Sequence, residues 1–142
     1  MRKALAPGDP IALACELVAV DSRNPDLVPD GPGEGACAQL LAGILHDWGF
    51  HVELQEVTRG RPNVVARIGK AGGRSLMLNG HLDTVGVERM THAPWDPEIR
   101  DGRLYGRGSA DMKGGIAAMC AAAWRAANAP GGLAGEIGRA HV

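Results

Sequence analysis

One stripe of apolar residues with helical spacing, followed directly by runs of alternating polarity, most constrains the fold of this chain. The stripe lies within residues 34–48, and Gly49 stands where a left-handed residue ends many helices. Its members are Leu40, Leu41, Ile44, Leu45 and Trp48. Apolar residues then alternate with polar ones over 52–57 and 64–68, as they do in half-buried strands. The sequence therefore predicts a helix over 34–48 and two strands after it.

Two further helices are predicted towards the ends of the chain. Asp9 can cap the first, and Pro10 suits its first helical position, where the missing N–H costs nothing. The apolar residues of this helix with core-facing spacing are Ile11, Ala14, Cys15 and Val18. An alanine-rich segment predicts the last helix over about 112–127, which Pro130 and the two glycines after it end.

Shorter elements lie between these helices. A glycine-rich turn at 69–73 precedes residues 75–78, whose pattern predicts a buried strand. Asp101 and Gly102, between two short strand-like runs, predict a hairpin. Helices, strands and a closing helix in this order predict a three-layer α/β/α domain. A chain of 142 residues is long enough to bury a single hydrophobic core.

The composition argues against several functional classes. A net charge of -1 and few aromatic residues (Trp 3, Tyr 1, Phe 1) offer neither a basic nor a stacking surface for nucleic acid. No stretch approaches the roughly 18 apolar residues of a membrane span, and the first residues lack the apolar run of a signal peptide. The widely spaced Cys15, Cys37 and Cys120 form no CxxC pair, so neither a disulfide framework nor a thiolate zinc site is predicted. We expect a cytoplasmic protein with no nucleic-acid or membrane partner.

A candidate metal ligand follows the predicted buried strand. His81 and Asp83 are two positions apart, so their side chains point the same way in an extended segment. An imidazole can bind zinc through one nitrogen while a nearby carboxylate accepts a hydrogen bond from the other. The carboxyl end of a strand is also where open α/β sheets place ligands. The alternative is a structural histidine at a strand end.

A second candidate ligand, Asp111, precedes the last helix within the glycine-rich segment 106–115. The free N–H groups and the dipole at a helix N-terminus favour an ionised carboxylate. The two oxygens of a carboxylate can bridge two metal ions about 3.5–4 Å apart. The alternative is a plain helix cap at Asp111, with the glycines as turn residues.

Together the two segments resemble the M20 family of metallopeptidases and deacylases. The matching residues are His81-Leu82-Asp83-Thr84-Val85 and Gly106-Arg107-Gly108-Ser109-Ala110-Asp111-Met112-Lys113-Gly114-Gly115. The similarity extends over roughly residues 10–127, with both motifs in the family's order and spacing. It implies a zinc-exopeptidase-like α/β/α catalytic domain, of which this chain is the amino-terminal and incomplete part.

The resemblance also implies roles for individual residues. His81 matches the histidine that binds one metal ion, and Asp111 matches the carboxylate that bridges both and is often followed by a cis peptide. Asp83 matches the catalytic acid that orients the histidine. The implied reaction uses water activated by two zinc or cobalt ions to hydrolyse an amide bond in a small-molecule substrate, an N-acyl amino acid or small peptide.

Other polar residues have plainer interpretations. His46 and His51 flank the end of the second predicted helix and are expected at the surface, and His92 is expected to fill the core or make a loop contact. Arg107 is expected to make structural hydrogen bonds, with a contact to a substrate carboxylate as the alternative. Lys113 is expected either to place a supporting charge behind the site or to lie on the surface.

The family features that follow the Asp111 motif have no counterpart in this sequence. They are a Glu-Glu pair that holds the general base and a metal ligand, a further acidic ligand, a late histidine, and a smaller dimerisation domain. This dimerisation domain implies a homodimer as one option for the longer protein. Glu136 is the one acidic residue after Asp111. Residues 136–142 can be encoded by the opening bases of a common sequencing adapter, so we expect the family domain to occupy 1–135 and an artefactual tail to follow. The alternative function for the chain as given is therefore a truncated, inactive fragment with at most weak metal binding, because catalytic zinc usually has three protein ligands.

Overall fold

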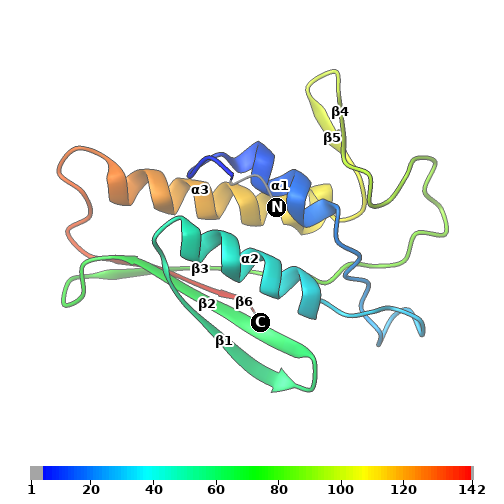
Figure 1. Ribbon diagram of the computed structural model, residues 1–142, viewed down its shortest axis with the longest axis horizontal. Helices are drawn as coiled ribbons and strands as arrows, with labels where there is room; N and C mark the ends of the chain where they lie inside the picture. The colour runs from blue at the N-terminus through cyan, green and yellow to red at the C-terminus, as the bar shows by residue number, and fades with distance from the viewer. Residues whose placement is uncertain (1–4, 142) are drawn as a thin grey trace.

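The computed structural model describes residues 5–141 and places a layer of helices on one face of a four-stranded sheet (Figure 1). The helices are α1 (Pro10–Val18), α2 (Gly35–Asp47) and α3 (Gly114–Asn128). The sheet contains β1 (His51–Thr58), β2 (Arg61–Gly69), β3 (Ser75–Gly80) and β6 (Glu136–His141), in the order β1-β2-β6-β3. A separate hairpin consists of β4 (Glu98–Arg100) and β5 (Arg103–Tyr105). The predicted α/β fold class is confirmed, and the described residues supply the sheet and one helical layer.

The sheet is mixed, and its last strand in sequence is central in space. β1 pairs with β2 and β2 with β6 in antiparallel fashion, whereas β6 pairs with β3 in parallel. Ile137 therefore has Ile68 as its partner on one side and Leu76 on the other. This strand lies within the predicted tail over 136–142, of which the structure describes 136–141. The artefactual origin of these residues stays a prediction.

One cluster of buried apolar residues lies between the helices and the sheet. The stripe predicted for α2 is confirmed at Leu41 and Leu45, which are fully buried. The stripe predicted for α1 is wrong at Ile11, which is 60% exposed, whereas Leu13 and Leu17 are fully buried. Because α1 packs against α3 rather than directly on the sheet, the position of α3 decides which face of α1 is covered.

Local signals at the helix ends are confirmed. Asp9 Oδ1 accepts two backbone hydrogen bonds from the first turn of α1, at 3.0 and 3.1 Å. Gly49 has a φ of 88°, and Phe50 N donates to Leu45 O at 3.0 Å, which closes α2 as a left-handed C-terminal cap. The longest helix, α3, has 15 residues, and no helix within residues 5–141 is long and apolar enough to cross a membrane.

The prediction of a buried strand over 75–78 is wrong in its burial. Leu76 and Met77 are 55% and 70% exposed, because β3 lies at one edge of the sheet. Leu76 pairs with Ile137, which packs against the core under the helices, so the next side chain, that of Met77, lies on the face opposite the helical layer. The strand itself forms as predicted and ends at the segment that carries His81.

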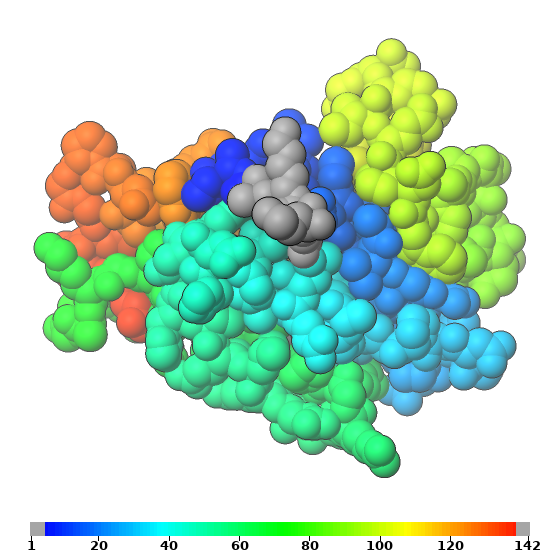
Figure 2. All heavy atoms as spheres, viewed as in Figure 1, coloured from blue at the N-terminus to red at the C-terminus, as the bar shows by residue number. Residues whose placement is uncertain are grey.

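The hairpin β4–β5 and the loop before it form a lobe at one end of the molecule (Figure 2). Asp101 and Gly102 have φ values of 50° and 72°, as a two-residue hairpin turn of this hand requires. The predicted hairpin is confirmed. Residues of the lobe, including His92 and Tyr105, line the same cavity as His81, so the lobe forms one wall of the candidate site.

Candidate metal centre

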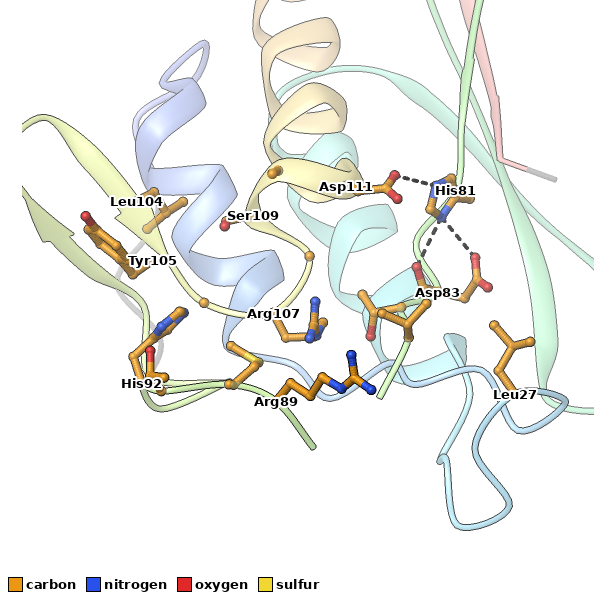
Figure 3. Close-up of a pocket in the computed structure, with 17 residues that line it drawn as sticks. Leu27, His81, Asp83, Arg89, His92, Leu104, Tyr105, Arg107, Ser109 and Asp111 are labelled. Atoms are coloured by element: carbon orange, nitrogen blue, oxygen red, sulfur yellow. Dashed lines mark hydrogen bonds and ion pairs between the residues drawn. The ribbon is translucent and has the colours of Figure 1, made fainter. Parts of the chain in front are cut away.

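The candidate ligands come from two segments that meet beside the carboxyl end of β3. His81 follows β3 directly, and Asp111 lies in an irregular turn, Ser109–Lys113, that leads into α3. The Asp111–Met112 peptide bond is cis, as the family resemblance implies. The side chains of His81 and Asp111 point toward one another (Figure 3).

The His81 ring lies between two carboxylates. Its Nδ1 is 3.1 Å from Asp83 Oδ1 and 3.1 Å from the backbone oxygen of Asp83. Its Nε2 is 3.0 Å from Asp111 Oδ1. A proton on Nδ1 therefore has two acceptors, and this leaves Nε2 as the nitrogen that can bind a metal ion.

The electrostatic surroundings of His81 favour a positive charge at the ring. Burial alone would lower the pKa of His81, but the hydrogen bonds to Asp83 and Asp111 and the charges of both carboxylates outweigh it, so the pKa lies above its ordinary value. The same carboxylates that attract a proton attract a metal cation. A metal ion bound at Nε2 must replace a proton there, and its binding is therefore coupled to proton release.

The two donor atoms fit a common metal ion. Ligand bonds of about 2.0–2.2 Å in a tetrahedral zinc site place two donors about 3.3–3.5 Å apart, and His81 Nε2 and Asp111 Oδ1 are 3.0 Å apart. A shift of a few tenths of an ångström would therefore admit an ion. The Asp111 side chain is 85% exposed, so its second oxygen faces solvent. No group of three or more potential protein ligands occurs within residues 5–141, and these residues therefore hold part of a coordination sphere.

A cavity of about 480 Å³ opens beside these residues. His81, Asp83 and Asp111 lie at one end, and His92 and Tyr105 lie at the other (Figure 3). Arg89 and Arg107 line the cavity between the two ends. The space adjoining the candidate ligands can therefore hold a small molecule.

The two arginines of this cavity lack ion pairs among the described residues. Of the structural hydrogen bonds expected for Arg107, none forms at its Nε, which is buried with no partner within residues 5–141. The backbone N–H of Arg107 donates to Pro94 O at 2.7 Å instead. The Arg89 and Arg107 guanidinium groups thus line the cavity beside Asp83 and Asp111 without a described ion pair to either carboxylate.

Three other histidines, His46, His51 and His92, lie where the sequence predicts. His46 and His51 are exposed, at the end of α2 and the start of β1. His92 makes an edge contact with the Tyr105 ring, with ring centres 5.5 Å apart, which confirms a loop contact for this residue. His92 also lines the cavity, a position that its sequence context does not indicate.

Residues 77–138 match the sequence profile described as Peptidase family M20/M25/M40. Both candidate ligands, His81 and Asp111, fall within the matched segment. The chain belongs to this family. Membership of the M20 metallopeptidases implies divalent metal ions, and the donor set and spacing at His81 and Asp111 are compatible with them.

Curated relatives of this M20 chain are named succinyl-diaminopimelate desuccinylases. One from Ruegeria sp. is 41% identical over 120 residues, which cover 81% of this chain and 28% of the relative. One from Methylorubrum extorquens is 44% identical over 120 residues, which cover 80% of this chain and 29% of the relative. The chain thus spans less than a third of the length of the curated relatives that it matches.

Solved structures share the fold. Human carnosine dipeptidase 1 superposes with a TM-score of 0.74 at 25% identity, over 93% of this chain and 31% of that chain. The M20 metallo-carboxypeptidase Sso-CP2 from Sulfolobus solfataricus superposes with a TM-score of 0.76 at 23% identity, over 94% of this chain and 30% of that chain. The described residues therefore adopt the arrangement of one part of longer M20 proteins.

Sequence reasoning missed one contact of this M20 site and left another open. Asn24 Nδ2 donates to Asp83 Oδ2 at 2.8 Å, a contact that no sequence pattern around Asn24 indicates. Lys113 is 1% exposed and donates to Val20 O at 2.7 Å, so the surface alternative for Lys113 is wrong. A polar Asn-Pro turn is a weak signal, because nothing local indicates a partner 59 positions away.

Proposed function

We propose that this chain supplies the amino-terminal part of the active site of a metal-dependent hydrolase that cleaves amide bonds in N-acyl amino acids or small peptides. The observation that carries the proposal is the meeting of His81 Nε2 and Asp111 Oδ1 at 3.0 Å, with Asp83 on the other ring nitrogen. Support also comes from the M20 family and from relatives whose names state desuccinylation.

Each of the three residues has a distinct proposed role. His81 Nε2 and Asp111 Oδ1 would hold a divalent ion, zinc or cobalt, and the exposed second oxygen of Asp111 would be available to a second ion. Asp83, the proposed catalytic acid, accepts a hydrogen bond from the Nδ1–H of His81 and thereby keeps the Nε2 lone pair directed toward the metal site. Divalent metal ions supply an activated water molecule and polarise an amide carbonyl when bound.

The unpaired arginines of the cavity favour a substrate that carries a carboxylate. Guanidinium groups bind carboxylates through paired hydrogen bonds, and Arg89 and Arg107 line the cavity that contains His81. An N-succinyl amino acid carries carboxylates near its amide bond. We therefore favour acyl amino acids over neutral amides as the substrate class.

For the 142-residue chain alone we propose weak metal binding and no turnover. Two ligand candidates fall short of the three that catalytic zinc usually has, and the chain spans under a third of its curated relatives. The domain assignment of residues 1–135, with an artefactual tail after it, is part of this proposal. Incubation of the purified chain with zinc and N-acetylated amino acids tests it, because measurable hydrolysis would contradict it.

A chimera tests the hydrolase proposal directly. Residues 1–135 of this chain replace the equivalent segment of the desuccinylase from Ruegeria sp., and hydrolysis of N-succinyl-diaminopimelate is followed by release of succinate. We expect activity that falls by at least about 100-fold in His81→Ala and Asp111→Ala. His51→Ala, which removes an exposed histidine at the start of β1, is the matched control. Unchanged turnover in either ligand variant would exclude that residue from metal binding.

We also propose that the protein works in the cytoplasm. Its three cysteines, Cys15, Cys37 and Cys120, lie far apart in the sequence and form no CxxC pair, a pattern suited to a reducing compartment. Cell fractionation with an antibody to the chain tests the location. Homodimer formation by the longer protein stays a prediction.

A further inference from the structure

A short segment between α1 and α2, residues 20–24, runs alongside the His81 segment; we call it the clamp segment. Ser22 Oγ donates to Leu82 O at 2.7 Å, and Ser22 O accepts a hydrogen bond from Thr84 N at 2.9 Å. Asn24 N donates to Thr84 O at 2.8 Å. These bonds form an isolated parallel bridge, which fixes the backbone on both sides of Asp83.

The side chain of Asn24 completes the contact with the candidate site. Its Nδ2 donates to Asp83 Oδ2 at 2.8 Å, and its Oδ1 accepts a hydrogen bond from Asp26 N at 2.9 Å. Because the backbone N–H of Asp26 requires an acceptor, the NH₂ side of the amide must face Asp83. With Oδ2 held in this way, Asp83 Oδ1 faces His81 Nδ1 at 3.1 Å.

The other end of the clamp segment contacts the Asp111 turn. Lys113 is almost fully buried, and its Nζ donates to Val20 O at 2.7 Å. Its backbone N–H donates to Gly108 O at 2.8 Å, which closes the turn that carries Asp111. The clamp segment thus bonds to the segment of each candidate ligand.

We propose that Asn24 is a positioning residue of the metal centre and that the clamp segment sets the separation of His81 and Asp111. A carboxylate that orients a metal-binding histidine can rotate about its own bond unless its second oxygen is held. Asn24 holds that oxygen of Asp83, and Asp83 in turn fixes the ring orientation and the tautomer of His81. The inference rests on the metal-binding role of His81 and Asp111 proposed above.

Cobalt binding to the 142-residue chain tests the proposal, with Co²⁺ absorbance as the readout. Asn24→Asp keeps an acceptor for the backbone N–H of Asp26 but loses the donor to Asp83, and Asn24→Ala removes both without adding charge. We expect the Kd for Co²⁺ to rise about 10- to 100-fold in both variants. Asn128→Ala is the matched control, because Asn128 Nδ2 also donates one hydrogen bond, to Trp124 O at 2.8 Å, at the far end of α3. Its Kd should stay within about twofold of the original.

The tautomer of His81 supplies a second readout, which needs no metal. Nitrogen-15 NMR of the metal-free chain, at a pH where the ring is neutral, should show the proton on Nδ1 in the original chain and in Asn128→Ala. In both Asn24 variants we expect a mixture of tautomers, with circular dichroism confirming that each variant is folded.

The outcomes separate this proposal from the proposed function. Unchanged Co²⁺ affinity and an unchanged tautomer in both Asn24 variants would overturn the positioning role. A loss of affinity in Asn24→Asp alone would also overturn it, because the effect would then come from the added charge. Absence of Co²⁺ binding by the original chain would contradict the metal-binding role, and the tautomer would still decide the role of Asn24.

Discussion

Replacing Gly108 with alanine is expected to destabilise this chain more than the same replacement at Gly102. Both glycines have left-handed backbones, with φ values of 82° and 72°, so alanine is strained at either position. A Cβ at Gly108 would lie 2.8 Å from Thr84 Cγ2 and 3.1 Å from Lys113 Cδ, whereas a Cβ at Gly102 would meet nothing within 4 Å. Backbone strain is therefore common to both variants, and crowding is specific to Gly108.

The two effects have separable magnitudes. A left-handed backbone costs an alanine about 1–2 kcal/mol, and this is the full loss expected for Gly102→Ala. Forcing an extra methyl group into packed surroundings costs a further 1–3 kcal/mol or so, which gives a total of about 2–5 kcal/mol for Gly108→Ala. Thr84 and Lys113 both form hydrogen bonds with the clamp segment, so the displaced atoms also connect to the candidate metal centre.

Urea denaturation followed by tryptophan fluorescence measures both losses on the same chain. The free energy of unfolding should fall further in Gly108→Ala than in Gly102→Ala, by roughly 1–3 kcal/mol. Co²⁺ affinity should fall only in Gly108→Ala. Equal stability losses in the two variants would refute the reasoning, because they would show that Thr84 and Lys113 move aside without cost.

Three further predictions follow from the core, the sheet and the metal centre. Leu41→Ala, in the buried stripe of α2, should lower the free energy of unfolding by about 2–5 kcal/mol, whereas Leu27→Ala, at an exposed leucine, should change it by less than about 0.5 kcal/mol in a urea titration. Gln55→Ala should raise the pKa of Glu53, which hydrogen bonds from Gln55 and neighbouring side chains hold below its ordinary value. A carboxyl group whose pKa is lowered by folding stabilises the folded state at pH values above its unfolded pKa, and this stability is lost as the pH falls through its folded pKa. An NMR titration should show Glu53 protonating at a higher pH in Gln55→Ala. Zinc at 100 times its Kd should stabilise the chain by about 2.7 kcal/mol in thermal unfolding, and His81→Ala should abolish most of this shift.

Local sequence signals predicted where helices, strands and turns form better than they predicted which residues of these elements are buried. The Asp9 cap, the Gly49 cap and the hairpin turn form where the sequence indicates them, because each depends on a few neighbouring residues. The burial of Leu76 depends on which strands lie on either side of β3, and the insertion of β6 leaves β3 at the edge. The exposure of Ile11 likewise depends on where α3 packs. Such properties arise from tertiary arrangement, which periodicity alone does not contain.

In the candidate site, too, contacts within one short segment were easier to predict from the sequence than contacts between distant segments. His81 and Asp83 could be paired from their two-residue spacing, because an extended backbone determines where both side chains point. The approach of Asp111 to His81 was expected from the family resemblance rather than from the spacing of the residues. The contact of Asn24 with Asp83 had no sequence signal, because it links segments 59 positions apart through one amide.

The central place of β6 has a consequence for synthesis of the chain on the ribosome. β2 and β3 follow one another in sequence but do not pair with each other, since each bonds to β6. Until a strand fills the place that β6 occupies here, the facing edges of β2 and β3 present unpaired backbone groups to the surrounding solution. A nascent chain that pauses before residue 136 therefore exposes the facing edges of β2 and β3 to chaperones or to another copy of itself.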